Sequence, residues 1–144
     1  MKVTFEMSDA YDEALVQIYA NCMTDQIREI IQICSEETQG TLFGFKEEQL
    51  IPIQKEEMVR FFSLDKKTYC ETESETLLIK EVLYKLEERF THMIRISNSE
   101  MINPDFIKDL ELSLAGTIKV NLKNGEQTYT SRRYMKEFKR RLGI

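Results

Sequence analysis

The chain has few of the residues on which metal binding and redox chemistry depend. It contains three cysteines and one histidine among its 144 residues. Cys22, Cys34 and Cys70 are widely spaced and form no CxxC pair, and His92 is the one histidine that could join them in a metal site. We therefore expect buried or neutral thiols in a reducing compartment, with no metal and no other cofactor.

Proline, glycine and long apolar runs are also scarce. Two prolines and five glycines argue against long disordered or low-complexity tracts. No apolar run approaches the roughly 20 residues that cross a bilayer, and the first residues are too polar for a secretory signal. The sequence predicts one folded, cytoplasmic body.

Recognisable sets of catalytic residues are missing as well. His92 has no flanking serine or cysteine motif that would mark a nucleophile and its base. Glu71, Glu73 and Glu75 lack the spacing and the glycine of a calcium loop, and the isolated glycines form no phosphate-binding loop. A solvated acidic turn and a packed or surface histidine are the simpler interpretations. We predict that the chain is not an enzyme.

Positive charge is in deficit overall but concentrated toward the C-terminus. The net charge is -5. Residues 1–89 carry 10 Lys and Arg against 19 Asp and Glu, whereas residues 90–144 carry 10 against 6. A basic region on an acidic body is typical of a nucleic-acid-binding surface, even when the total charge is negative.

The first forty residues predict two strands and one helix. Apolar and polar residues alternate over residues 3–7, and a second apolar stretch covers residues 15–19, which indicates a pair of strands. Thr24 is suited to cap a helix. Apolar residues at helical spacing then predict an amphipathic helix over residues 25–36; they are Ile27, Ile30, Ile31 and Cys34.

Beyond residue 40 the apolar pattern indicates many short strands and two helices. Helical stripes cover residues 82–90 and 134–142, and Asn124 with Gly125 predicts a two-residue hairpin turn. Closely spaced short strands favour antiparallel sheets, so the fold class is mainly β with short helices (α+β). The predicted strands are 41–45, 49–53, 59–64, 68–72, 76–79, 93–96, 108–112, 117–122 and 127–131.

Side-chain amides and guanidinium groups gather near two of the predicted turns. Asn98 lies beside Arg95 at the end of a strand, where its amide could pair with adenine in a major groove. Arg132 and Arg133 follow the hairpin and offer planar donors for guanine or phosphate. The simpler alternative is that Asn98 and Asn103 make turn hydrogen bonds, while the basic helix is only a solvated face.

Several short motifs follow one another over this half of the chain. They are Val59-Arg-Phe-Phe62, Lys66-Lys-Thr68, Leu83-Tyr-Lys-Leu86, Ile94-Arg-Ile-Ser-Asn-Ser99, Ile102-Asn103, Leu122-Lys-Asn-Gly125 and Ser131-Arg-Arg-Tyr134. In type and order they resemble the LytTR family of bacterial DNA-binding domains, over roughly residues 42–144. The resemblance implies an elongated arrangement of small antiparallel sheets, whose loops enter successive major grooves of double-stranded DNA.

The function implied by the resemblance is a transcriptional regulator that binds repeated promoter sites. Two positions depart from the common family pattern: Ser97 stands where histidine is frequent, and Glu100 where an apolar or neutral residue is usual. Carried onto this sequence, the base contacts are Lys67 or Thr68, Asn98 and Arg133. The phosphate contacts are Arg95, Ser97, Ser99, Arg132, Lys136 and Arg140.

Residues 1–40 resemble the strand-and-helix extension of stand-alone family members, ahead of a DNA-binding domain at 41–144. The extension is expected either to form a homodimer or regulatory contact, or to close the core of its own chain. A homodimer suits repeated sites, because linking two DNA-binding domains of modest affinity raises the avidity for DNA. The resemblance also suggests a membrane-bound regulatory protein as a partner.

A different function stays open at this point. The chain could be a protein-interaction or sensor module without specific DNA binding, whose sheet edges and N-terminal helix hold another protein. That alternative predicts weak DNA binding with no sequence preference.

Overall fold

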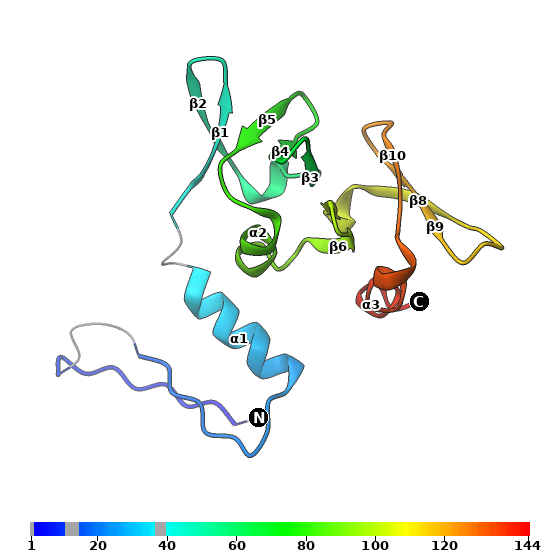
Figure 1. The fold of residues 1–144 in the computed structure, drawn as a ribbon. Coiled ribbons are helices and arrows are strands. Elements are labelled where there is room, and N and C mark those ends of the chain that lie inside the picture. The colour runs from blue at the N-terminus through cyan, green and yellow to red at the C-terminus, as the bar shows by residue number, and fades with distance from the viewer. Residues whose placement is uncertain (1, 11–14, 37–39) are drawn as a thin grey trace. The chain divides into compact units, whose positions relative to one another are not determined.

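Thr24 begins the helix of the N-terminal part of the chain. Its Oγ1 accepts a hydrogen bond from the backbone N of Ile27 at 3.2 Å and so caps helix α1 (Asp25–Glu36). The predicted helix is confirmed. The computed structural model describes residues 2–10, 15–36 and 40–144, and the chain divides into two units, Met1–Gln39 and Gly40–Ile144 (Figure 1).

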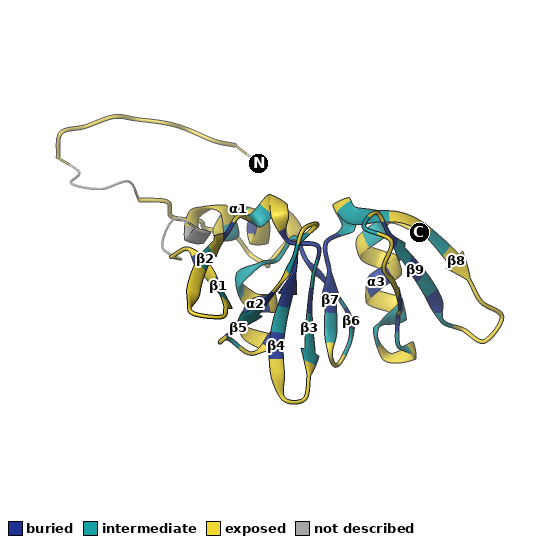
Figure 2. Ribbon diagram, turned by 90° about the horizontal axis from the view of Figure 1, so that it is seen from above, coloured by how far each residue is buried: buried dark blue, intermediate teal, exposed yellow. Residues whose placement is uncertain are grey.

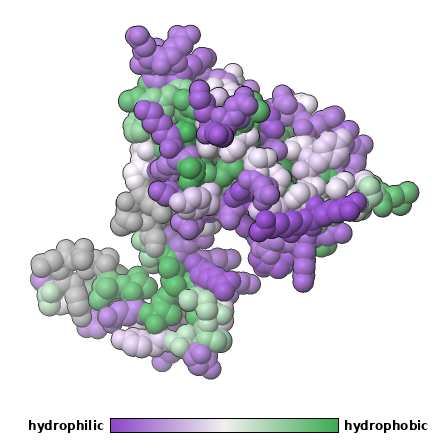
Figure 3. Space-filling view, viewed as in Figure 1, coloured by the Kyte–Doolittle hydropathy of each residue, from purple (hydrophilic) through white to green (hydrophobic). Residues whose placement is uncertain are grey.

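The two strands predicted ahead of this helix are wrong. Residues 2–10 and 15–24 contain no strand, and the side chains of Val3, Phe5 and Met7 are more than 80% exposed. Alternation gives a strand only where a neighbouring strand completes the backbone hydrogen bonds. The described residues supply no such neighbour, so the apolar side chains stay on the surface (Figure 3).

The C-terminal unit is built from two antiparallel sheets, which confirms the predicted mainly β fold. A seven-stranded sheet has the order β2-β1-β5-β4-β3-β7-β6, and a three-stranded sheet has the order β10-β9-β8. The strands are β1 (Leu42–Lys46), β2 (Gln49–Ile53), β3 (Arg60–Leu64), β4 (Lys67–Glu71), β5 (Thr76–Ile79), β6 (Ile94–Ser97), β7 (Glu100–Ile102), β8 (Ile107–Leu112), β9 (Ile118–Leu122) and β10 (Gln127–Tyr129). The helices of this unit are α2 (Leu83–Arg89), α3 (Met135–Leu142) and the 3-10 turns η1 (Lys55–Glu57), η2 (Pro104–Phe106) and η3 (Arg132–Tyr134).

Two clusters of buried side chains hold this unit together, and Figure 2 marks the buried positions along the ribbon in dark blue. The first packs α2 against the seven-stranded sheet and includes Phe61 and Leu86. The second joins β6 and β7 to the three-stranded sheet and α3, and includes Ile96, Val120 and Phe138. Because the Phe138 side chain is fully buried, α3 is fixed against both sheets. No helix in the described ranges is long and apolar enough to cross a membrane.

Two local features differ from the sequence prediction. The short strand β7 was not predicted, because three residues are too few for an alternating pattern to be recognised. The turn after β9 contains three residues rather than two: the N of Gly125 donates to the Leu122 carbonyl at 3.0 Å, and the N of Leu122 donates to the Glu126 carbonyl at 2.9 Å. Gly125 alone in this turn has a positive φ, of 91°, as a three-residue hairpin with a bulge requires.

Candidate nucleic-acid interface

Three turns project from the same side of the C-terminal unit (Figure 2). The turn between β3 and β4 is a tight two-residue hairpin, since Asp65 and Lys66 both have positive φ, of 50° and 63°. The turn between β6 and β7 lies beside it, because the N of Ser63 donates to the Ser99 carbonyl at 2.8 Å. The η3 turn follows next, and the N of Ser131 at its start donates to the Ile96 carbonyl at 2.8 Å.

The first turn presents Lys67 and not Thr68. Lys67 is exposed at the start of β4, whereas Thr68 is only 8% exposed and pairs with Ser63 and Ile79 in neighbouring strands. A side chain with so little exposed surface offers a base edge little to contact. Of the two alternatives that the sequence offered at this turn, the structure favours Lys67.

The Arg95 side chain holds the turn between β6 and β7 in place. Its Nε donates to the Ser97 carbonyl at 2.6 Å, its Nη2 to the Asn98 carbonyl at 2.5 Å, and its Nη1 to Glu87 at 3.1 Å. The side chain is 16% exposed. Within the turn, the N of Ser99 donates to the Ser97 Oγ at 3.2 Å. These bonds fix the backbone that carries Asn98.

Asn98 itself is exposed at the tip of this turn. Its Oδ1 accepts a hydrogen bond from the hydroxyl of Tyr134 at 3.0 Å, which joins the second turn to η3. The neighbouring Asn103 has a different place. It is 2% exposed, donates from Nδ2 to the Met58 carbonyl at 2.8 Å and accepts from the N of Asp105 at 3.0 Å, so it is a structural residue.

The third turn and α3 carry the basic residues. Arg133 is exposed, with its guanidinium carbon 5.6 Å from the centre of the Tyr134 ring, and Arg132 donates to the Ala115 carbonyl at 3.4 Å. Lys136 is exposed in the first turn of α3. Arg140 pairs with Glu137 through two hydrogen bonds of 2.9 and 2.5 Å, and this pairing lowers the pKa of Glu137.

Comparison with known proteins shows the family of this chain. The family model of the LytTr DNA-binding domain matches residues 48–143. The chain belongs to the LytTR family. Uncharacterised HTH-type transcriptional regulators of Staphylococcus aureus strains MSSA476 and MW2 are 32% identical to it, over 100% of this chain and 99% of each relative. A solved LytTr DNA-binding domain from Bacillus cereus matches 74% of this chain and 99% of its own, with a TM-score of 0.70 and 25% identity.

Membership of the LytTR family confirms the resemblance seen in the sequence and the prediction that the chain is not an enzyme. The likeness to the Bacillus cereus domain confirms the fold class. The relatives are named for a helix-turn-helix, but within the described residues strands separate each α-helix from the next. The described α-helices are therefore not joined by a short turn, as the two helices of a helix-turn-helix are.

The side chain of Glu100 in this LytTR domain belongs to a polar network between the two sheets. Arg60 donates to Glu71 through Nε and to Glu100 through Nη1, the latter at 3.0 Å. From the hairpin of the other sheet, Thr128 donates to Glu100 at 2.6 Å and Asn124 donates to Glu71 at 2.5 Å. Glu100 is therefore paired with an arginine and held within the network between the two sheets.

Burial and ion pairing have opposite effects on the pKa of Arg60. The side chains of Arg60, Glu71 and Glu100 are 16%, 10% and 13% exposed. Burial lowers the pKa of Arg60, but the hydrogen bonds to the two carboxylates outweigh it and raise the pKa above the ordinary value of an arginine. The guanidinium consequently stays charged and bridges the sheets.

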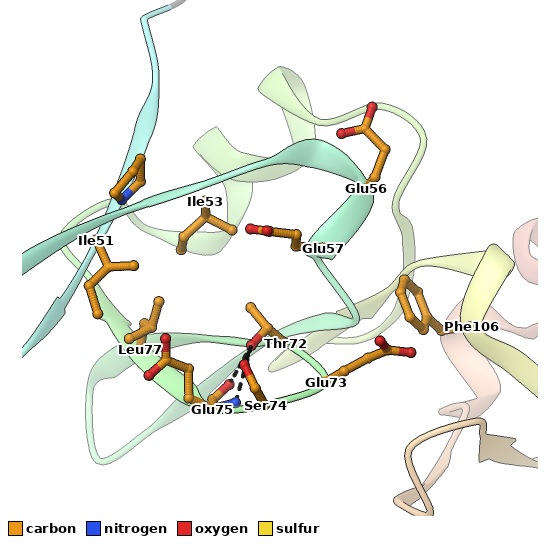
Figure 4. A pocket seen from close by; sticks show the side chains of 11 residues that line it. Ile51, Ile53, Glu56, Glu57, Thr72, Glu73, Ser74, Glu75, Leu77 and Phe106 are labelled. Carbon is orange, nitrogen blue, oxygen red and sulfur yellow. Dashed lines mark hydrogen bonds between the residues drawn. The ribbon is translucent and has the colours of Figure 1, made fainter.

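A group of acidic residues, which includes the Glu73 and Glu75 noted in the sequence, lies at the opposite end of the strands from the three turns. Glu56, Glu57, Glu73 and Glu75 surround a hollow of about 360 Å³ with an apolar floor that includes Leu77 (Figure 4). The acidic loop after β4 and the turn before β4 are separated by the length of that strand. Within the described ranges, no three His, Cys, Asp or Glu side chains are grouped to hold a metal ion.

The remaining reactive side chains are not placed at the three turns. His92 packs edge-on against Phe90, with ring centres 6.2 Å apart, which agrees with the first of the two interpretations, a packed or a surface residue. Cys70 is buried, and burial together with nearby carboxylates raises its pKa to about 12, so the thiol stays protonated at neutral pH. Cys22 and Cys34 are exposed, not buried.

Proposed function

We propose that this protein is a transcriptional regulator that recognises repeated promoter sites by inserting its turns into successive major grooves of double-stranded DNA. The observation that carries the proposal is the row of three adjacent turns presenting Lys67, Asn98 and Arg133 on one side. Membership of a DNA-binding family and relatives named as transcriptional regulators support it. Such a protein acts where the bacterial chromosome lies, in the cytoplasm.

Each of the three side chains offers a donor that matches a base edge. Arg133 and Lys67 match the O6 and N7 acceptors of guanine, and Asn98 matches purine N7 or the adenine edge. The turns lie next to one another because backbone hydrogen bonds join Ser63 to Ser99 and Ser131 to Ile96. Rigid support from strands favours precise readout.

Phosphate contacts are proposed for the polar groups around these turns. Ser97 and Ser99 flank Asn98, and Arg132 flanks Arg133, while Lys136 and Arg140 extend along α3. Arg95 was predicted among them. Because its guanidinium already holds two carbonyls of the turn and Glu87, we propose that it acts chiefly as a support for Asn98.

Replacing Lys136 by alanine tests the proposed phosphate contact. The variant should bind specific and random duplexes more weakly by the same factor, and the slope of log affinity against log salt should fall by about one unit, because one fewer counterion is released. Affinities measured at several salt concentrations give this slope. The matched control is Lys46→Ala, at the acidic end of the sheet beside Glu75, and a slope for Lys136→Ala equal to that of the control would remove Lys136 from the interface.

We further propose that residues 1–40 form the contact between two copies of this chain. In the described part of this segment, Phe5, Leu15, Tyr19 and Ile33 expose 67–88% of their surface, and clustered exposed apolar side chains mark interaction surfaces. The staphylococcal relatives match over this segment too, since the alignment covers the whole chain. Two linked readers would bind repeated sites with higher avidity than one.

Sedimentation of an Ile33→Glu variant tests the dimer. A charge on the exposed face of α1 should shift the protein from dimer to monomer at micromolar concentration, because a buried unpaired carboxylate opposes association. Leu114→Glu, in the fully exposed turn between β8 and β9, is the control and should leave the dimer intact. A wild-type protein that sediments as a monomer with and without DNA would end this proposal.

Control by a membrane-bound protein stays a hypothesis, and co-purification from native membranes tests it.

The alternative of a protein-interaction module has its strongest support in the exposed apolar side chains of residues 2–10 and 15–24. It requires that a partner be retained after Arg132 and Arg133 are both replaced by alanine and that DNA binding show no sequence preference. A transcriptional regulator requires instead that DNA binding depend on the base sequence.

A further inference from the structure

Tyr134 contacts two of the residues proposed to read DNA, Asn98 and Arg133, and also the supporting Arg95. Its hydroxyl lies 3.0 Å from the Oδ1 of Asn98. Its ring centre lies 5.6 Å from the guanidinium carbon of Arg133 and 5.9 Å from that of Arg95, within the range of cation–π attraction. The tyrosine is half-buried, and its N donates to the Ser131 carbonyl at 3.1 Å, so its position is fixed by η3.

The hydroxyl bond decides which end of the Asn98 amide faces outward. In the structure the hydroxyl donates to the amide oxygen, so Oδ1 is directed toward Tyr134. Arg95 holds the backbone carbonyl of the same residue at 2.5 Å. With both oxygens of Asn98 directed at fixed donors, the Nδ2 group is the part of the side chain left to meet DNA.

A fixed amide has a direct consequence for base recognition. An outward Nδ2 donates to acceptors in the major groove, which are purine N7, guanine O6 and thymine O4. The reversed amide would instead present an acceptor to adenine N6 or cytosine N4. The two orientations read different base edges, and the side chain of asparagine alone does not choose between them.

We propose that Tyr134 is a specificity-determining positioning residue, which orients Asn98 as a hydrogen-bond donor and couples the β6–β7 turn to Arg133. This inference rests on the proposed function, because it assumes that Asn98 meets a base. The orientation of the amide depends on the tyrosine hydroxyl, whereas the contacts with the two arginines depend on the ring. A phenylalanine would keep the ring contacts and lose only the hydrogen bond to the amide.

The test is the base preference of a Tyr134→Phe variant at each position of the selected duplex. Asn98→Ala first identifies the base pair that Asn98 reads. At that pair, Tyr134→Phe should reduce discrimination between acceptor and donor edges by about 3- to 10-fold, the usual net value of one hydrogen bond. Other positions and random DNA should change little, and adding Tyr134→Phe to Asn98→Ala should have no further effect at that pair.

Tyr84→Phe is the matched control, because Tyr84 lies 60% exposed on α2. A second readout needs no DNA: the side-chain amide signal of Asn98 in a nitrogen–proton spectrum should shift in Tyr134→Phe and not in Tyr84→Phe. Equal weakening on all duplexes would make Tyr134 a phosphate contact and overturn the inference. So would an unchanged base profile beside a clear effect of Asn98→Ala, whereas a wild-type protein with no sequence preference would overturn the proposed function as well.

Discussion

Replacing Arg60 by methionine is expected to lower the free energy of unfolding by about 3–5 kcal/mol, because it leaves buried carboxylates without a counter-charge. Glu71 and Glu100 are 10% and 13% exposed and both depend on this guanidinium. Methionine fills a similar volume, so the loss reports the uncompensated charges and not a cavity. Urea denaturation of the variant and the wild type measures the difference.

Two further variants separate the buried network from an ordinary ion pair. Arg140→Met breaks an exposed pair with Glu137, whose side chains are 58% and 54% exposed, and should cost less than about 1 kcal/mol. Combining Arg60→Met with Glu71→Gln and Glu100→Gln should recover much of the loss, because neutral amides are cheaper to bury than carboxylates. If Arg60→Met costs no more than Arg140→Met, the network does not hold the two sheets together.

Replacing Arg133 by alanine is expected to weaken binding to the specific duplex by about 1–3 kcal/mol, the value of a bidentate base contact. That range corresponds to about 5- to 150-fold in affinity, while binding to random DNA should change much less. The reason is that Arg133 is exposed on η3 beside Asn98, where a guanidinium fork can meet guanine. Equilibrium titrations of both duplexes at one salt concentration give the two losses.

Arg132→Ala is the control for that experiment, since the neighbouring residue is proposed to touch phosphate. It should weaken specific and random binding alike and lower the salt slope. The base-contact assignment of Arg133 fails if its variant shows the same uniform loss as Arg132→Ala.

Local patterns were sufficient to predict most of the elements. The helix at 25–36 and the strand at 49–53 have the predicted bounds, because each is specified by the spacing of its own apolar residues. Residues 3–7 show the limit of such patterns. Their alternation satisfies the requirement of one face of a strand but says nothing about whether a second strand is present to pair with it.

The candidate site could be predicted only in part for a similar reason. Exposed donors such as Asn98 and Arg133 follow from motifs that are contiguous in the sequence. The inward orientation of Glu100 depends on Arg60 and Thr128, which are 40 and 28 residues away along the chain. The bond from Tyr134 to Asn98 spans 36 residues. Contacts of this kind arise from strand order and packing, which local periodicity does not encode.

Selection of bound duplexes from a random DNA pool, followed by titration of the selected duplex against a scrambled one, tests whether these turns read DNA sequence. We expect a repeated motif, bound above roughly 10³-fold more tightly than the scrambled duplex at physiological salt. Its positions should include one pair that is relaxed by Asn98→Ala and another relaxed by Arg133→Ala. A pool that yields no motif, with equal affinity for both duplexes, would contradict sequence-specific reading by these turns.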